Sequence, residues 1–219
     1  MPAALRPDGL DALTQAIDRC RAEGGCGSPH CGIHAVGKPT HQKAEGSSIL
    51  VVGEAPAVSG WWITGRAFYL RTPGGALELS RTGHNLNECL AALNAKVETV
   101  GFVEAVRCRP SNSARWRPSD RVRRKCLPFL AEHLRLTQPR LILPMGQVAA
   151  ASCLEIAFGA PSAKLEDVAG KVHFWHSTWG QSWIIPLYHP SPANSARWPK
   201  NMAFLTSFAK QRLRTRLES

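Results

Sequence analysis

Apolar residues along the chain form two patterns, short continuous runs and longer stretches with helical spacing, which predict strands and helices respectively. Near-continuous runs rich in Val, Ile and Leu are typical of strands buried on both faces of a sheet. Four segments have this pattern: 47–53, 97–108, 139–146 and 182–189. Helical spacing is found in five segments: 8–20, 82–95, 119–136, 147–158 and 199–217. The chain therefore alternates between strands and helices.

Several residues are expected to set the ends of these helices. Asp8, Thr82 and Ser119 are expected to cap three amino ends, because their side-chain oxygens can accept hydrogen bonds from unpaired backbone N–H groups. Gly159 is expected to end the helix that starts at residue 147. Pro128 is expected to end or kink the helix that follows Ser119.

Strands that alternate with helices predict an α/β fold, in which helices cover both faces of a mostly parallel, four-stranded sheet. No repeat, low-complexity tract or long linker divides the sequence, so a single domain over residues 1–219 is expected. Ligands of such sheets bind beyond the carboxyl ends of the strands. Four residues of interest lie at or just past these ends: Glu54, Cys108, Gly146 and His189.

The charge of the chain indicates the kind of partner it binds. Its 219 residues include 27 Lys and Arg against 16 Asp and Glu, a formal net charge of +11, and 44% are hydrophobic. This composition excludes intrinsic disorder, and the positive charge favours nucleic acid or an anionic membrane surface as a partner. No apolar stretch approaches the roughly 18 residues of a spanning helix, and the start of the chain does not resemble a signal peptide. A cytoplasmic location is therefore expected.

Seven cysteines in a chain without a secretory signal favour metal or cluster ligation over disulfides. Cys89 and Cys153 lie within apolar helical patterns and are expected to be buried, inert thiols. The other five are candidate ligands: Cys20, Cys26, Cys31, Cys108 and Cys126.

Two polar residues at strand ends are candidates for chemistry. Glu54 follows a strand and precedes Ala-Pro and a glycine-containing loop, a setting that can hold a carboxylate beside a closely approaching ligand. The alternative is a solvated turn residue. His189 leaves a strand into a loop bounded by Pro and Ser, and its alternative is a histidine that only packs.

Five short motifs extend this interpretation: GEAP at 53–56, GRAF at 65–68, VRCRP at 106–110, LILPMG at 141–146 and HPSP at 189–192. In their order and near spacing they resemble the iron-sulfur uracil-DNA glycosylases, families four and five of that superfamily. The resemblance covers roughly residues 20–210. It implies a three-layer αβα fold and a monofunctional enzyme of DNA repair. Such an enzyme flips a deaminated base, foremost uracil, out of DNA and hydrolyses its N-glycosidic bond.

The resemblance also implies roles for residues around the base. Glu54 would position or activate water and stabilise an oxocarbenium-like transition state, and His189 would donate a hydrogen bond to uracil O2. Phe68 would stack on the base, with a core-filling side chain as the alternative. Three further residues would complete the base-binding site: Gly53, Ala55 and Ser191.

For DNA, the resemblance implies that segment 191–198 enters the minor groove, with Arg197 as a contact. Scattered surface arginine is the alternative for Arg197. Many basic residues lie in or beside the loop between Cys108 and Cys126, and three of them are expected to contact DNA: Arg109, Arg115 and Arg117. The expected partner is DNA containing deaminated bases, bound by a monomer associated with the nucleoid and not with membranes.

The resemblance further implies a 4Fe-4S cluster, with zinc as the chemical alternative. Its ligands would be Cys108, Cys126, Cys31 and either Cys26 or Cys20, of which Cys26 is preferred. The N-terminal arm, residues 1–46, would carry two of them. Bound in this way, the cluster would tie the arm to the basic loop.

The sequence departs from the family pattern at positions that bear on the substrate. Ala57 replaces a glycine, and the paired Trp61 and Trp62 are unfamiliar. Glu104 replaces an asparagine that reads the uracil edge, and an ionised carboxylate can only accept hydrogen bonds. Glu104 is therefore expected either to bind a base such as hypoxanthine or xanthine, or to point away into a salt bridge.

Two other classes of protein stay open at this point. One is a non-catalytic or covalently trapping DNA-binding protein of the same fold. The other is a redox or zinc-site protein whose basic charge is incidental.

Overall fold

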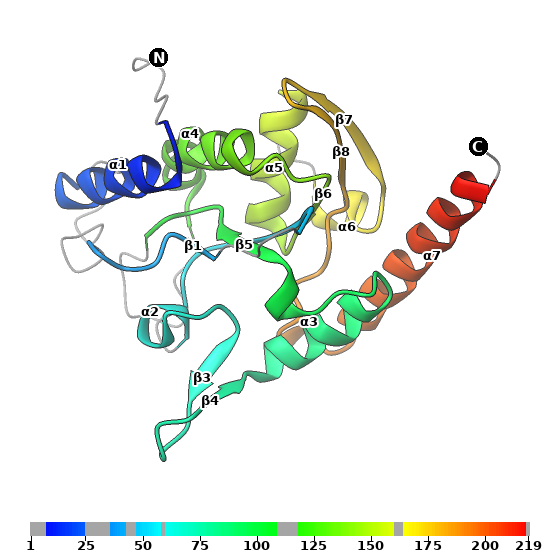
Figure 1. Cartoon of the computed structure of the whole chain (residues 1–219), viewed down its shortest axis with the longest axis horizontal. Coiled ribbons are helices and arrows are strands. Elements are labelled where there is room, and N and C mark those ends of the chain that lie inside the picture. The colour runs from blue at the N-terminus through cyan, green and yellow to red at the C-terminus, as the bar shows by residue number, and fades with distance from the viewer. Residues whose placement is uncertain are drawn as a thin grey trace.

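The computed structural model describes residues 8–24, 36–42, 47–57, 60–108, 118–159 and 164–217, with side chains of the last helix described as far as residue 212. Within these residues six strands form one sheet (Figure 1). In spatial order they are β1 (His41–Gln42), β5 (Gly101–Glu104), β2 (Ile49–Gly53), β6 (Leu141–Pro144), β8 (Gly180–Ile184) and β7 (His173–Ser177). The four central strands are parallel, as predicted, and both edge strands pair antiparallel.

The two edge strands correct the expectation of four strands. β1 contains only two residues, too few for a hydrophobic pattern to mark. The residues of β7 are half-buried or exposed, so this strand lacks the continuous apolar run on which the prediction relied.

Helices cover both faces of the sheet (Figure 1). Successive side chains of β2 point to opposite faces. Val51 packs with α3 (Arg81–Ala91) and α7 (Trp198–Leu217), whereas Leu50 and Val52 pack with α4 (Asp120–Thr137) and α5 (Gln147–Phe158). α1 (Leu10–Ala22) packs against α4. This arrangement confirms the predicted three-layer αβα fold.

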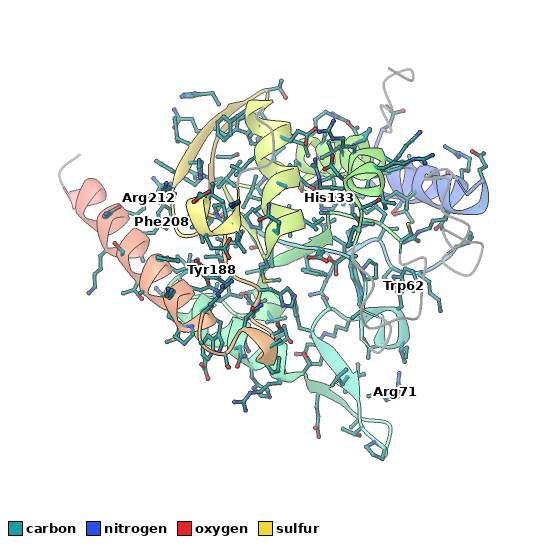
Figure 2. The ribbon with its side chains drawn as sticks, turned by 180° about the vertical axis from the view of Figure 1, so that it is seen from behind. Trp62, Arg71, His133, Tyr188, Phe208 and Arg212 are labelled. Atoms are coloured by element: carbon teal, nitrogen blue, oxygen red, sulfur yellow. The ribbon has the colours of Figure 1, made fainter. Side chains whose placement is uncertain are left out.

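The remaining elements are short: α2 (Trp61–Thr64), β3 (Tyr69–Arg71), β4 (Leu77–Leu79), α6 (Leu165–Val168) and two 3-10 helices, Val97–Thr99 and Pro192–Asn194. β3 and β4 form a hairpin that extends away from the main sheet, and Arg71 lies on it (Figures 1 and 2). The strand predicted over 97–108 is shorter in the structure than expected, because a 3-10 helix occupies Val97–Thr99 and β5 spans only Gly101–Glu104.

The helix ends confirm two predictions and correct two, and the helix that contains Pro128 does not end at that residue. The Ser119 hydroxyl accepts a hydrogen bond from the Val122 N–H at 3.3 Å, and Gly159 ends α5 at a φ of 63°. Asp8 and Thr82 are not caps: Gly9 and Ser80 occupy those positions, and the Ser80 hydroxyl accepts from the Gly83 N–H at 3.1 Å. Pro128 lies inside α4, on its exposed side, where water can hydrate the carbonyl that loses its partner, and the helix continues to Thr137.

Two of the seven cysteines lie in the core as predicted. Cys89 of α3 and Cys153 of α5 are buried, and desolvation is the main cause that raises the pKa of each thiol to about 12. Both thiols are therefore protonated and unreactive near neutral pH. No helix among the described residues combines the length and apolar content needed to cross a bilayer.

Candidate active site

A cavity of about 340 Å³ lies at the carboxyl ends of the parallel strands, with β3 and the start of α3 in its wall. We call it the inner cavity and define it by Gly53, Phe68, Phe102, Glu104 and His189. Its volume is at the lower end of the roughly 300 to 1,000 Å³ typical of small-molecule sites. Its place agrees with the rule that open α/β sheets bind ligands beyond the carboxyl ends of their strands.

A second hollow of about 540 Å³ opens next to the first. We call it the outer groove and define it by Gly146, Tyr188, Ser191, Asn194 and Arg197. The inner cavity and the outer groove share Glu54, Ala55, Ala57 and His189 in their walls. The two candidate reactive groups therefore stand at the boundary between the two hollows.

Glu54 and His189 both lie beside Gly146. A β-carbon at Gly146 would lie 3.9 Å from Glu54 Oε2 and 3.7 Å from His189 Cβ, so both side chains reach the same glycine. Its φ of +88° is a conformation that other residues rarely adopt. The Glu54 carbonyl accepts from the Val106 N–H at 3.0 Å, which continues the pairing of β2 with β5 past the strand ends.

Three asparagines hold the backbone that carries His189, and sequence reasoning missed all of them. The Asn201 amide of α7 accepts from the Tyr188 N–H at 3.0 Å and donates to the Tyr188 carbonyl at 2.7 Å. Asn85 of α3 donates to the Pro190 carbonyl at 2.9 Å, and Asn194 donates to the His189 carbonyl at 3.1 Å. A polar residue on the buried face of a helix, as at Asn85 and Asn201, is the signal that could have found them.

Phe68 is held in a strained conformation in the wall of the inner cavity. Its φ is +68°, and its carbonyl accepts from the Ser80 N–H at 2.7 Å, directly before α3 begins. The Phe68 ring meets Phe102 edge to face, with ring centroids 4.7 Å apart. Left-handed backbone at a bulky residue is costly and tends to occur at functional sites. The side chain remains half-buried and lines the cavity, so it is available to a ligand.

Glu104 ends β5 with its carboxyl group inside the protein. It is 7% exposed, and its Oε2 atom has no hydrogen-bond partner among the described residues. A β-carbon at Gly53 would collide with this carboxyl group, lying 2.8 Å from Cδ. Glycine at position 53 therefore makes room for Glu104. The Trp61 indole N–H in the same wall is likewise buried without a partner in the described part of the chain.

The expectation that Glu104 points away into a salt bridge is wrong for the residues that the structure describes. Arg107 follows β5, but its guanidinium donates to the carbonyl oxygens of Thr40 at 2.8 Å and Phe129 at 3.3 Å. Burial raises the pKa of Glu104 well above its ordinary value, although Arg107 opposes this rise and Glu54 adds to it.

The basic residues near the cysteines divide into internal and exposed groups. Arg107 and Arg123 are buried and do not face solvent. Desolvation is the main cause that lowers the pKa of Arg107, to about 10, and Arg123 pairs with Asp120 at 2.7 Å and Glu155 at 2.6 Å. The exposed basic side chains in the first two turns of α4 are Arg121, Arg124 and Lys125, and Arg135 is exposed near its end. Arg109, Arg115 and Arg117 lie outside the described residues.

Arg197 lies in the outer groove and is 53% exposed. It donates to Glu166 Oε1 at 3.0 Å, and its guanidinium is 5.7 Å from the centre of the Tyr188 ring. An exposed ion pair of this kind contributes little to stability. Arg197 can therefore exchange Glu166 for another anion at small cost.

Two cysteines, Cys108 in the segment that follows β5 and Cys126 of α4, pack in one apolar cluster with Val106 and Val122. They are 3% and 5% exposed. Cys20 packs beside a different cluster, between α1 and α4. Trp62 packs against the first cluster, 5.8 Å from the Arg21 guanidinium (Figure 2). Cys26 and Cys31 lie outside the described residues.

No three His, Cys, Asp or Glu side chains form a metal site within the part of the chain that the structure describes. The two thiols that pack together nevertheless suit half of a four-thiolate site, since soft sulfur ligands hold iron-sulfur clusters and zinc. The fit of the remaining ligands rests on residues outside the described part.

A further cavity of about 370 Å³ lies at the opposite, amino ends of the strands. Phe208 and Arg212 of α7 line it together with Trp183 of β8 (Figure 2). Its described lining contains no carboxylate, histidine or cysteine. The inner cavity is therefore the better candidate for chemistry.

The fold and the site define a class of protein that comparison with known families identifies. Residues 40–211 match the model of the uracil DNA glycosylase superfamily. The chain belongs to this superfamily. It is 28% identical over 160 residues to a type-4 uracil-DNA glycosylase of Pyrobaculum aerophilum, covering 71% of this chain and 74% of the relative. It is also 28% identical over 185 residues to a type-4 uracil-DNA glycosylase of Archaeoglobus fulgidus, covering 84% and 82%.

Proposed function

We propose that this protein is a monofunctional DNA glycosylase that hydrolyses the N-glycosidic bond of uracil in DNA and so initiates base excision repair. One observation carries the proposal. Glu54 and His189 meet at Gly146, on the boundary between the inner cavity and the outer groove. Superfamily membership and the two type-4 relatives support the same conclusion.

The geometry supports a division of roles in this reaction. The flipped base enters the inner cavity and stacks on Phe68, while the sugar stays at the boundary beside Glu54. The carboxylate orients water and stabilises positive charge on the sugar as the bond breaks. His189 donates a hydrogen bond to the base carbonyl on which negative charge collects. Gly53 and Ala55 line the inner cavity and are proposed to contact the base.

The outer groove is the proposed path of the DNA backbone. Ser191 and Arg197 line it, and the weak pair of Arg197 with Glu166 leaves the guanidinium able to bind a phosphate. Arg109, Arg115 and Arg117 are proposed to extend the basic surface. The net charge of +11 would then contribute to affinity through contacts that do not depend on sequence.

A 4Fe-4S cluster is proposed at Cys108 and Cys126, with Cys31 and Cys26 as the other ligands and zinc as the alternative metal. Cys20 packs beside the α1–α4 cluster instead, which favours Cys26. The cluster would act as a structural brace between the N-terminal arm, residues 1–46, and α4. A single domain over 1–219, a monomeric state and a cytoplasmic, nucleoid-associated location also stay predictions.

The proposal is tested with oligonucleotides that contain one uracil, hypoxanthine or xanthine. After incubation with the protein, alkali cleaves the strand wherever a base has been removed. We expect scission foremost at uracil. Tight binding without scission on any of the three would favour a non-catalytic relative, and a complex that survives denaturing electrophoresis would favour a covalently trapping one.

A further inference from the structure

The polar groups of the inner cavity lie at two depths. Glu54 and His189 belong to the boundary, because they line the outer groove as well. Glu104 lines the inner cavity but not the outer groove. A base that enters past the boundary therefore meets Glu104 with its far edge, while its glycosidic bond stays near Glu54.

The surroundings of Glu104 do not suit a negative charge. Phe102 lies beside it in the cavity wall, and Gly53 allows its carboxyl group to lie against the backbone of β2. Its Oε2 atom is buried with no hydrogen-bond partner in the described residues. An ionised carboxylate left in this way costs far more free energy than a neutral acid.

The charged and titratable groups that face Glu104 do not reverse this conclusion. Arg107 is close enough to favour ionisation, but it donates to backbone carbonyls and forms no ion pair with Glu104. Glu54, from the end of β2, disfavours a second negative charge. Burial outweighs Arg107, Glu54 acts in the same direction as burial, and the pKa of Glu104 is raised well above its ordinary value. Three further titratable side chains line the cavity: Tyr69, Arg81 and His189.

We propose that Glu104 acts as a neutral carboxylic acid that selects the base, donating its O–H to a base carbonyl and accepting the neighbouring ring N–H. This inference rests on the proposed glycosylase function. Uracil presents C4=O beside N3–H, and hypoxanthine and xanthine present C6=O beside N1–H, so all three share this lactam edge. The neutral acid has one donor and one acceptor for it, whereas a carboxylate has acceptors only and would repel the base carbonyl.

Two substitutions separate the neutral acid from a carboxylate. Glu104→Gln keeps the shape and offers one donor and one acceptor, so we expect excision of uracil within a few-fold of wild type. Glu104→Leu removes both hydrogen bonds and should lower kcat/KM by about 10-fold to 100-fold, the range for a two-point contact with a base. Equal loss in both variants would overturn the proposal, because it would mean that the negative charge is required.

The pH dependence of the two rates gives a second test. Ionisation of Glu104 disables only the wild type, because the amide introduced by Glu104→Gln cannot ionise. The ratio of the Glu104→Gln rate to the wild-type rate should therefore stay constant at pH values where Glu104 is neutral. It should rise as the pH passes the folded-state pKa of Glu104. A ratio that falls as pH rises would show that the ionised form is the active one. Loss of activity through Glu54 or His189 affects both proteins and cancels in the ratio.

A stability measurement tests the protonation state without relying on activity. A folded-state pKa above the unfolded value gives stability that is fully present below the unfolded pKa and is lost as pH rises through the folded pKa. The urea midpoint of the wild type should therefore fall relative to that of Glu104→Gln over this window. A relative rise would contradict a neutral Glu104. If wild type excises none of the three bases, the proposed function fails, while this comparison still decides the protonation state.

Discussion

Glycine and asparagine residues set the geometry of the site more than the reactive side chains do. Gly146 supplies the positive-φ backbone beside Glu54 and His189, and Gly53 admits Glu104. Asn201 holds both polar backbone groups of Tyr188, the residue before His189. Such buried hydrogen bonds to the backbone contribute little net stability each, but leaving their partners unpaired is costly. The position of His189 is therefore determined by residues that do not react.

His189→Ala should slow the chemical step strongly. If His189 stabilises the charge on the departing base, single-turnover excision of uracil should fall by about 100-fold to 1,000-fold, as for the loss of one donor to a developing oxyanion. His176→Ala, at an exposed histidine of β7, is the matched control and should keep the wild-type rate. Wild-type rates from His189→Ala would refute the role.

At the scale of elements, the hydrophobic pattern was enough to predict the strands and helices that form the core. The runs at 47–53 and 139–146 contain β2 and β6. As predicted, Ser119 caps the start of α4 and Gly159 ends α5. The hairpin of β3 and β4 was not predicted, because four of its six strand residues are exposed and the other two are half-buried, so they show no buried alternation.

The site itself was predictable only in part. The resemblance of the motifs predicted that Glu54, Phe68 and His189 surround one base, and all three line the inner cavity. The carboxyl ends of parallel strands meet at the same edge of a sheet, which is why such residues lie close together. The protonation of Glu104 was not predictable, because it depends on burial, and the sequence suggested an ionised acceptor. The roles of Asn85 and Asn201 were not predictable either, because each amide bonds a backbone group more than ten residues away in the chain.

The cap of α3 links an element end to the base pocket. Ser80 caps the helix with its hydroxyl, and its backbone N–H holds the carbonyl of the strained Phe68. Ser80→Ala should lower the free energy of unfolding by about 1 kcal/mol. It should also slow single-turnover excision several-fold, because a frayed first turn loosens Phe68.

Ser119→Ala is the matched control, since Ser119 caps α4 in the same way. It should cost similar stability in urea unfolding while leaving the excision rate at saturating protein unchanged. Equal slowing in both variants would show that the rate reflects general stability and not the position of Phe68.

For the whole molecule, charge and cysteines lie in the same region of the chain. Cys108 and Cys126 are packed together behind the exposed basic side chains of α4. The buried Arg21 of α1 joins this region to two other segments, because its guanidinium donates to the carbonyl oxygens of Arg107 and Lys38. A cluster held there would brace the surface that carries the excess positive charge.

The metal is distinguished by colour and composition. We expect purified wild-type protein to be brown and to contain iron, and Cys108→Ala to lose both, because thiolate-bound iron absorbs visible light. Cys153→Ala changes a buried thiol of α5 and should keep colour and iron. Colourless wild-type protein that contains zinc would replace the cluster with a zinc site, since zinc has a filled d shell.

The central claim is that Glu54 performs chemistry at the boundary of the inner cavity. It is tested most directly by measuring, on one uracil-containing duplex, the single-turnover excision rate and the dissociation constant of wild type and Glu54→Gln. Glu88→Gln, at an exposed carboxylate of α3, serves as the control. We predict that Glu54→Gln excises uracil at least about 100-fold more slowly, the lower range for a lost acid–base group, while its affinity for the duplex is retained. An unchanged rate, or equal losses of rate and affinity, would contradict this account.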